Sequence, residues 1–338
     1  MHGLDPLSPS EGVKMYLDER RPEVTKSTLH EHSTRLNRFT EWCEKEGVDN
    51  LNALTRRKVQ EYKNWRQKDV APTTLTNEIR TLRLAIEFWE SIDGVAEGVA
   101  RNVNVPTTPK REQSRDVKLD PDHAEAIMEY LGKYEYATLR HTMFAIVWHT
   151  GCRTSGLRAL DLGDYNPDEY RKPVLEFRHR PDSGTPLKKE RWGEREVPIK
   201  PEIKEIIEDY IKTNRKDVTD EFGREPLLTT REGRVYKTTV QRNIYRLTQP
   251  CYIGTECPEG KDPETCEFTK YNKSSQCPVS VSPHSVRKGN VTHLRDLGIS
   301  FEDMSDRVDA TPEVLRQHYD VPTPDERRER QFDLVDEM

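Results

Sequence analysis

Residues 174–199 read VLEFRHRPDSGTPLKKERWGEREVPI and set the fold class of the second part of the chain. Segments 174–178 and 195–199 are short and rich in β-branched and aromatic residues, as strands are, and the glycines and proline between them favour a turn. We therefore predict a β-hairpin with a basic turn. Helical periodicity surrounds it on both sides. The predicted helices cover 121–132, 135–149, 203–211 and 238–249.

The first hundred residues are predicted to form a bundle of four or five helices over residues 8–95. Apolar residues recur at helical spacing without a break over 75–89. Ser8 followed by Glu11 fits a capping box at a helix start. Further candidate N-caps are Thr55 and Thr73 or Thr74.

The helical pattern stops over residues 101–118, where two prolines and a polar run without periodicity are typical of a linker. The sequence therefore predicts two domains. The overall class is mainly α with a small β-sheet, and consists of an all-helical first domain and a mixed α+β second domain. The predicted segments are 1–100 for the helical domain, 101–118 for the linker, 119–322 for the mixed domain and 323–338 for a C-terminal tail.

The composition argues against several classes of protein. Of the 338 residues 33% are hydrophobic and 34% are charged, and the formal net charge is −6. No run approaches the ~18 apolar residues of a membrane span, and the first residues lack the pattern of a signal peptide, so we expect a cytoplasmic protein. The absence of GxxxxGKS/T, GxGxxG and HExxH motifs argues against nucleotide hydrolysis and zinc proteolysis.

Three separated segments carry the residues of one candidate active site. They read TGCRTSGLRALDL from Thr150, SPHSVRKGN from Ser282 and LRQHYD from Leu315. Their order resembles the tyrosine recombinases, the phage-integrase family of DNA strand-exchange enzymes that includes the XerC- and XerD-like recombinases. The family pattern is an arginine in a TGxR segment, a basic hairpin with a lysine, an HxxR motif on a later helix and then a tyrosine. The resemblance covers residues 115–322, and the first domain is similar to the SAM-like core-binding domain of that family.

The resemblance implies that Arg153, His284 and Arg287 act on the scissile phosphate. The chemistry agrees, because charge grows on the phosphate in the transition state and two guanidiniums can each donate a planar pair of hydrogen bonds to it. His284 and Arg287 are three residues apart, so on a helix both face the same way. His284 is expected to assist proton transfer or phosphate binding.

The resemblance also implies that Tyr319 is the nucleophile. A tyrosine hydroxyl that attacks phosphorus gives a covalent phosphotyrosine, which conserves the ester for rejoining without ATP. The leaving 5′-hydroxyl needs a proton, and a lysine of the hairpin supplies it in the family. Lys188 is the preferred general acid here, and Lys189 is its close rival.

Asp309 departs from the family pattern, which usually has a second histidine or a tryptophan at this place. A carboxylate beside a phosphate is unfavourable unless it is protonated or paired. We therefore expect either that Asp309 points away or that a neighbour such as Thr311 or His318 takes the contact. Lys288 is the second departure, because the family often has histidine after the arginine.

Four of the six cysteines crowd into residues 251–277. This insertion is rich in glycine, proline and acidic residues, so it has little apolar content to hold it folded. Four thiolates can close a tetrahedral Zn²⁺ site and order such a loop, and a flexible loop with reduced cysteines is the alternative. The family's cleavage chemistry implies no catalytic cofactor, and similar insertions extend the resemblance to its archaeal, especially haloarchaeal, members. The candidate ligands of a structural zinc are Cys251, Cys257, Cys266 and Cys277, whereas Cys43 and Cys152 are expected to be packing residues.

Basic side chains gather in residues 55–68 and in residues 171–200, where they can contact DNA phosphates. Residues 55–68 carry six Lys or Arg against one acidic residue, although a solvated helix face is the alternative interpretation. The resemblance implies that the two domains close on double-stranded DNA as a clamp, without a membrane partner. The candidate DNA-binding residues are Arg56, Arg57, Lys58, Lys63, Lys189 and Arg191.

The resemblance further implies assembly on DNA. The family recombines DNA as a homo-tetramer, so we expect a monomer or dimer without DNA and a tetramer on it, associated with the nucleoid. An accessory directionality factor is a candidate partner. A C-terminal helix often docks on the neighbouring subunit in the family, and residues 323–338 are the candidate for it; a frayed tail is the alternative.

The leading hypothesis is a site-specific recombinase that cleaves and rejoins duplex DNA through a covalent 3′-phosphotyrosine intermediate, in integration, excision or dimer resolution. A type IB-like topoisomerase or resolvase would share the catalytic group but not the outcome. A DNA-binding regulator with a decayed site is the third hypothesis, motivated by Asp309.

Overall fold

The structure is a computed structural model that describes residues 3–107, 117–318, 328, 331–332 and 335. The chain divides into two compact units, Met1–Arg115 and Asp116–Met338. This division lies inside the predicted linker 101–118. Among the described residues, no helix combines the length and the apolar character that crossing a membrane requires.

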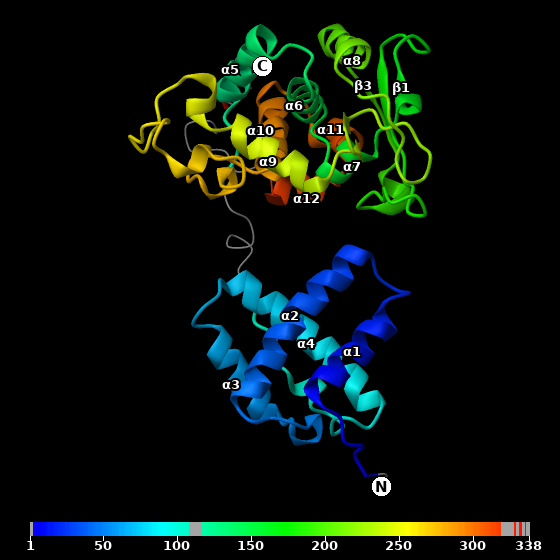
Figure 1. Ribbon diagram of the computed structural model, residues 1–338, viewed down its shortest axis with the longest axis vertical. Coiled ribbons are helices and arrows are strands. Elements are labelled where there is room, and N and C mark those ends of the chain that lie inside the picture. The colour runs from blue at the N-terminus through cyan, green and yellow to red at the C-terminus, as the bar shows by residue number, and fades with distance from the viewer. Residues whose placement is uncertain (1–2, 108–116, 319–327, 329–330, 333–334, 336–338) are drawn as a thin grey trace. The chain divides into compact units, whose positions relative to one another are not determined.

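The first unit is a bundle of α-helices joined by short connections (Figure 1). Helix α4 contacts each of the other three α-helices described in this unit. Its helices are α1 (Pro9–Arg20), α2 (Lys26–Lys45), α3 (Arg56–Arg66) and α4 (Pro72–Ser91), with 3-10 turns η1 (Leu51–Ala53) and η2 (Ala100–Asn102).

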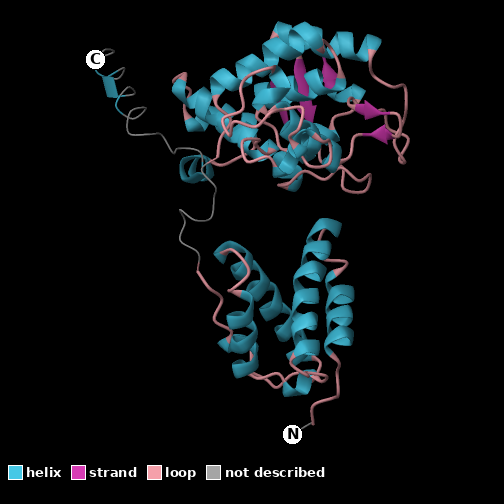
Figure 2. Cartoon of the chain, turned by 60° about the vertical axis from the view of Figure 1, so that its left-hand side comes forward, coloured by secondary structure: helices cyan, strands magenta, loops and turns pink. Residues whose placement is uncertain are grey.

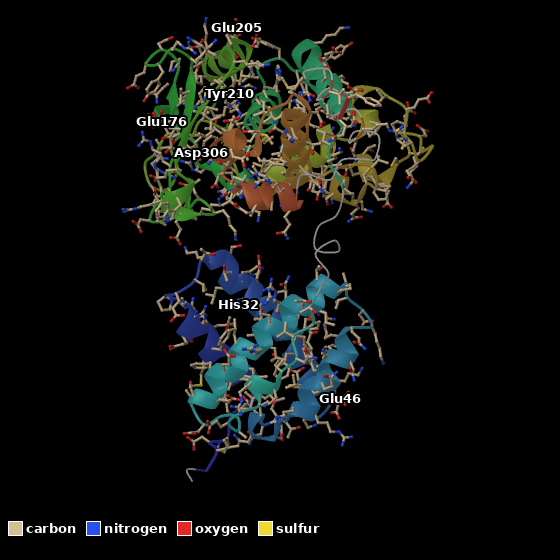
Figure 3. All side chains as sticks on the ribbon, turned by 180° about the vertical axis from the view of Figure 1, so that it is seen from behind. His32, Glu46, Glu176, Glu205, Tyr210 and Asp306 are labelled. Carbon is tan, nitrogen blue, oxygen red and sulfur yellow. The ribbon has the colours of Figure 1, made fainter. Side chains whose placement is uncertain are left out.

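Aromatic side chains fill the centre of the first unit. The ring centroid of Phe39 lies 5.4 Å from that of Tyr62, edge-on, and 5.9 Å from that of Trp89. Such pairs add roughly 0.5–1.5 kcal/mol beyond the burial of their area. The indole N–H of Trp89 donates a 2.7 Å hydrogen bond to the Gly12 carbonyl, so its polar atom is satisfied inside the core. His32, labelled in Figure 3, is buried, and its ring stacks on that of Tyr16 with a centroid distance of 5.9 Å.

The capping predictions are confirmed at two helix starts and wrong at a third. Ser8 caps α1 and forms the predicted capping box with Glu11, and Thr55 caps α3. Helix α4 instead begins at Pro72, before Thr73 and Thr74. Proline is favoured at the first helical position because it lacks the N–H that would be unsatisfied there and its φ is already helical.

The second unit packs α-helices around a small antiparallel sheet, which confirms the predicted class of mainly α with a small β-sheet (Figure 2). The strand order is β1-β2-β3. Its elements are α5 (Pro121–Tyr134), α6 (Leu139–Thr150), α7 (Thr154–Ala159), β1 (Tyr165–Asn166), β2 (Val174–Phe177), β3 (Arg195–Pro198), α8 (Pro201–Thr213), β4 (Thr229–Thr230), β5 (Gly233–Arg234), α9 (Lys237–Leu247), α10 (Pro283–Asp296), α11 (Phe301–Val308) and α12 (Pro312–His318).

The predicted hairpin is present as β2 and β3, with Leu175 opposite Val197. Strand β1 and the β4–β5 pair were not predicted from the sequence. Each of these strands has two residues, which is too short to show an alternating pattern in the sequence.

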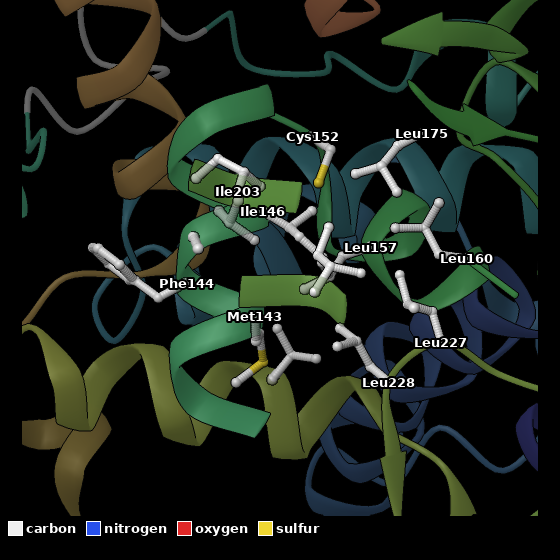
Figure 4. Packing of buried hydrophobic residues seen from close by; sticks show 14 of the residues in the cluster. Met143, Phe144, Ile146, Cys152, Leu157, Leu160, Leu175, Ile203, Leu227 and Leu228 are labelled. Carbon is white, nitrogen blue, oxygen red and sulfur yellow. The ribbon is translucent and has the colours of Figure 1, made fainter. Parts of the chain in front are cut away.

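Helix α6 forms the centre of the second unit. Met143, Phe144 and Ile146 are fully buried there (Figure 4), and α5, α8 and α10 all contact this helix. The consecutive apolar residues 143–148 of α6 suit an interior helix, and each buried side chain of this size contributes about 1.5–3 kcal/mol. The interior position of α6 fixes where its C-terminal end, and the turn after it, lie.

Gly289→Ala is expected to destabilise the second unit, because α10 passes the backbone at Leu119 too closely for a side chain. A Cβ at Gly289 would lie 2.2 Å from the Leu119 carbonyl oxygen. Relieving such overpacking costs about 1–3 kcal/mol, which urea unfolding of the full chain measures. The matched control is Gly132→Ala in α5, where a Cβ meets nothing within 4 Å and alanine should stabilise the helix by up to about 1 kcal/mol. Unchanged stability of Gly289→Ala would contradict the close approach of α10 to Leu119.

Candidate active site

Arg153 stands in the turn between two helices. Helix α6 ends at Thr150, Gly151 adopts a left-handed φ of 61°, and Arg153 is the N-cap residue of α7. Glycine is needed at position 151 because of this φ and because a Cβ would lie 2.5 Å from the side-chain oxygen of Asn290 on α10. The turn therefore brings the chain directly before Arg153 next to α10.

Helix α10 carries two of the predicted phosphate-binding residues. Arg287 is only 1% exposed, and its guanidinium donates a 2.6 Å hydrogen bond to the Gly151 carbonyl. One turn further along, Asn290 donates a 2.5 Å hydrogen bond to the Trp148 carbonyl. These bonds fix α10 against the end of α6. His284, in the first turn of α10, is exposed.

Asp309 points into this region. It follows α11 with a φ of 53°, a left-handed conformation that aspartate tolerates better than most residues. Arg153 donates hydrogen bonds to its carboxylate and, at 2.7 Å, to its backbone carbonyl. The Lys189 ammonium lies 3.6 Å from the other carboxylate oxygen. The expectation that Asp309 points away is therefore wrong, because two cations hold its carboxylate in place.

The hairpin places its two candidate lysines differently. The side chain of Lys189 is 35% exposed and reaches Asp309, whereas Lys188 is exposed. Glu190 has a left-handed φ of 54° and begins a 3-10 turn, η5 (Glu190–Gly193), which redirects the chain after Lys189. Arg191 is exposed on this turn, next to Trp192, which is 92% exposed.

Arg195 is a third arginine of the site that sequence analysis missed. It begins β3, its guanidinium lies 4.1 Å from the centroid of the Phe177 ring, and it donates a 3.0 Å hydrogen bond to the Gly193 carbonyl. Burial, together with the nearby positive charges of Arg287 and Arg153, lowers the pKa of Arg195 to about 10, although the Asp309 carboxylate acts in the opposite direction. Its place in the basic hairpin was the one signal that could have identified it.

These side chains form a cationic cluster. Arg153 and Lys189 contact the carboxylate of Asp309, and Arg195 interacts electrostatically with Asp309, Arg153 and Arg287, so four positive charges gather in one region. Partly buried guanidinium and ammonium groups bind oxyanions through short, charge-assisted hydrogen bonds. The cluster can therefore hold a phosphate group, and Asp309 now supplies an anion from within the protein.

Tyr319, the predicted nucleophile, lies outside the described residues, and so does most of the predicted tail 323–338. Helix α12 ends at His318, directly before it. Leu315 of α12 is fully buried in a cluster with Met304 of α11. The last described helix is thus packed on the helix that leads into Asp309.

The predicted DNA-binding residues of the first unit lie on α3. Arg56 and Arg57 are exposed, and Arg57 pairs with Glu61 at 3.1 Å. Lys58 is half-buried, and Lys63 donates a 3.1 Å hydrogen bond to the Asn104 carbonyl. A groove of about 790 Å³ along α4, lined in part by Arg80 and Arg83, was not predicted.

Comparisons with known proteins found matches among solved structures. XerH site-specific recombinase bound to palindromic difH substrate is matched with a TM-score of 0.65 over 98% of this chain and 85% of its own, at 12% identity. The Tn1549 transposon integrase in complex with a circular intermediate DNA has a TM-score of 0.63 over 96% of this chain and 99% of its own, at 16% identity. The N-terminal domain of a phage integrase/site-specific recombinase from Haloarcula marismortui is 34% identical over 30% of this chain and 99% of its own, with a TM-score of 0.30. No family model matches the sequence, and neither does any curated protein.

Asp309→Asn is expected to lower the free energy of unfolding by roughly 1–3 kcal/mol, because Arg153 and Lys189 lose the charge that neutralises them. The same change opens the cluster to external anions, so sulfate should raise the Tm of this variant more than that of the wild type. Thermal unfolding in sulfate and in chloride at matched ionic strength measures both effects. Asp306→Asn, the same charge change at an exposed position of α11, is the control. An equal response to sulfate in the two variants would show that Asp309 does not occupy an anion site.

Proposed function

Because the chain has the fold of the tyrosine recombinases, we propose that it is a site-specific DNA recombinase that cleaves and rejoins duplex DNA through a 3′-phosphotyrosine intermediate. The observation that carries this proposal is the cationic cluster of Arg153, Lys189, Arg195 and Arg287. Three guanidiniums and an ammonium gathered in one region can stabilise the negative charge that a phosphodiester develops during displacement.

In this proposal Arg153 and Arg287 hold the scissile phosphate, and the buried Arg195 adds a further positive charge near both of them. Arg287 is buried and tied to the Gly151 carbonyl, so its position is fixed before DNA arrives. Such preorganised donors stabilise a transition state without reorganising during the reaction. The ion pair between Asp309 and Arg153 must break when the phosphate enters, because the carboxylate and the phosphate are anions that compete for the same guanidinium.

Tyr319 is the proposed nucleophile. Its oxygen forms a bond to phosphorus while the bond from phosphorus to the 5′ oxygen breaks, and the tyrosine proton passes to His284 or to water. The 5′ oxygen leaves as a hydroxyl after taking a proton. The reverse attack of a 5′ hydroxyl on the phosphotyrosine reforms the DNA backbone, so the cycle needs neither ATP nor a metal ion.

Lys189 is the hairpin lysine that we propose as the general acid, in preference to Lys188. Its ammonium lies 3.6 Å from Asp309 and so next to the anion site. The Asp309 carboxylate orients this ammonium before DNA binds. Once a phosphate displaces the carboxylate, Lys189 is left beside the departing 5′ oxygen, where a proton donor is needed.

Duplex DNA is the proposed partner of both units. Exposed Arg191 and Trp192 on η5, just before β3, can contact the backbone and the groove, and Arg56 and Arg57 of α3 can follow phosphates of the same duplex. Arg80 and Arg83, which line the groove along α4, are further candidates for phosphate contacts.

We further propose that the protein acts as a homo-tetramer on DNA and is a monomer or dimer without it, in association with the nucleoid. Residues 323–338 are the proposed segment that docks on a neighbouring subunit, and an accessory factor would set the direction of recombination. Integration, excision and dimer resolution are all outcomes of this chemistry.

A DNA-binding regulator that has lost catalysis is the second candidate function. The ion pair between Arg153 and Asp309 favours it, because a carboxylate occupies the guanidinium that a phosphate needs. This candidate predicts tight, specific DNA binding without covalent attachment. A type IB-like topoisomerase or resolvase would instead attach covalently at many sequences.

Covalent capture on DNA tests the proposed function and Tyr319 together. Sheared DNA from the source organism is incubated with the protein, quenched with SDS, and the protein-linked fragments are sequenced. We expect adducts at one recurrent sequence with the wild type and none with Tyr319→Phe. Tyr134→Phe, the same change at an exposed tyrosine of α5, should behave as the wild type.

Each other result has a definite meaning. Specific DNA binding without adducts would replace the recombinase with the regulator. Adducts at scattered sequences would favour the topoisomerase, and adducts that persist in Tyr319→Phe would assign the nucleophile to another residue.

Lys189→Ala is expected to slow cleavage of the recovered site by about 10²–10⁴-fold, the usual contribution of a general acid. A substrate with sulfur in place of the 5′ oxygen should restore the rate, because a thiolate leaves without a proton. Lys188→Ala, the adjacent and exposed lysine, should change the rate little on either substrate. Rescue by sulfur of Lys188→Ala alone would reverse the assignment. Gel analysis of single-turnover cleavage measures all four combinations.

A further inference from the structure

All four cysteines of the insertion line one small cavity. Its volume is about 10 Å³, and it lies between residues 249 and 279. A volume of this size corresponds to roughly one water-sized atom. The thiols come from separate points along 27 residues of chain, so their convergence is a property of the fold and not of sequence neighbours. They are Cys251, Cys257, Cys266 and Cys277.

The insertion has little else to hold it together. Its regular structure consists of short 3-10 turns, η6 (Pro250–Ile253), η7 (Glu267–Thr269) and η8 (Ser274–Gln276). None of the residues in these turns is fully buried except Ser274. Phe268 is the one aromatic ring at the cavity, and its carbonyl accepts a 2.9 Å hydrogen bond from the Gln249 side chain. A segment of this kind needs a further constraint to keep one conformation.

The four thiols are free and lie around the same cavity. Each is half-buried and outside any disulfide. Lys261, whose ammonium lies 4.5 Å from the Phe268 ring centroid, also lines the cavity and brings a positive charge to it.

We propose that Cys251, Cys257, Cys266 and Cys277 bind one Zn²⁺ ion in this cavity. Four sulfur ligands are a common set for a structural, tetrahedral zinc site, and the ion binds thiolates after the thiols release their protons. Within the described residues no three candidate ligands already stand in a metal-binding arrangement, so binding draws the thiols inward onto the cavity. The ion is structural, since the proposed cleavage chemistry does not use it.

The zinc site would stabilise the entry to α10. Cys277 lies five residues before Ser282, the N-cap of that helix. Between them, the Val281 amide donates a 3.0 Å hydrogen bond to the Thr248 hydroxyl, and the Ser280 hydroxyl donates one of 2.9 Å to the Ser274 carbonyl. A fixed insertion thereby sets where α10 begins, and with it His284. Loss of the ion is expected to loosen this start without removing any catalytic group.

Metal analysis of the full chain tests the proposal directly. Protein purified under reducing conditions should contain about one zinc ion per chain, and Co²⁺ in its place should give the absorption of thiolate-to-metal charge transfer. The double variant C257S/C266S should lose both signals. Cys43→Ala removes a buried cysteine of the first unit and should keep both.

Limited proteolysis adds a readout that does not depend on the variants folding. Trypsin should cleave the wild type after Lys261, Lys270 and Lys273 once zinc is removed by a chelator, and addition of Zn²⁺ should restore protection. Absence of bound metal and of the Co²⁺ signal in the wild type would overturn the proposal. Disulfides in thiol titration, or equal metal loss in Cys43→Ala, would overturn it as well. None of these measurements involves DNA, so their outcome is separate from that of the recombinase proposal.

Discussion

The hydrogen bond from Arg287 to the Gly151 carbonyl is the contact on which the candidate site depends. It joins the end of α6, the helix at the centre of the second unit, to α10, which is far away in sequence. Its geometry requires that nothing larger than glycine stand at position 151, and that α10 lie close enough for Asn290 to reach the Trp148 carbonyl. A buried guanidinium is tolerated only where its donors find acceptors, and the open end of α6 offers carbonyls that its own helix does not use. The site thus rests on a helix terminus that would otherwise need capping.

The same turn explains why the positive charges gather. Arg153 follows the Gly151 turn directly, and Arg195 and Lys189 come from the hairpin beside it. Like charges this close repel one another, which is why neighbouring arginines contribute to lowering the pKa of Arg195. An anion is therefore required for the cluster to be stable, and Asp309 provides one in the absence of a ligand. The positive charges of the cluster and the negative charge of the Asp309 carboxylate therefore stabilise each other.

The sequence predicted what depends on local pattern. Helix periodicity, the hairpin of β2 and β3 and the capping box at Ser8 are local, and each is present. The direction of Asp309 is not local, because it depends on a left-handed residue after α11 and on Arg153 from another segment. The contrast between Lys188 and Lys189 is not local either, because Lys189 is distinguished by its approach to Asp309, which comes from a distant segment. Arg195 was missed for the same reason, since its role comes from what packs around it. The TGxR and HxxR segments marked where the site lies, while its charge balance required the fold.

Under the proposed function, a carboxylate held at the phosphate site would make DNA binding and activation one event. Asp309 pairs with Arg153 and Lys189, which keeps both side chains oriented. A phosphodiester can take its place only if the rest of the duplex contributes enough binding free energy to break that ion pair, and remote contacts are where such energy is available. Isolated phosphate or short DNA lacks those contacts, so the Asp309 carboxylate would stay paired with Arg153. Only a duplex gripped along its length would displace Asp309, and the reacting groups would then meet a phosphate that has already been selected by its surroundings. The departure from the family pattern at this position is in this view a threshold against cleavage at loosely bound DNA.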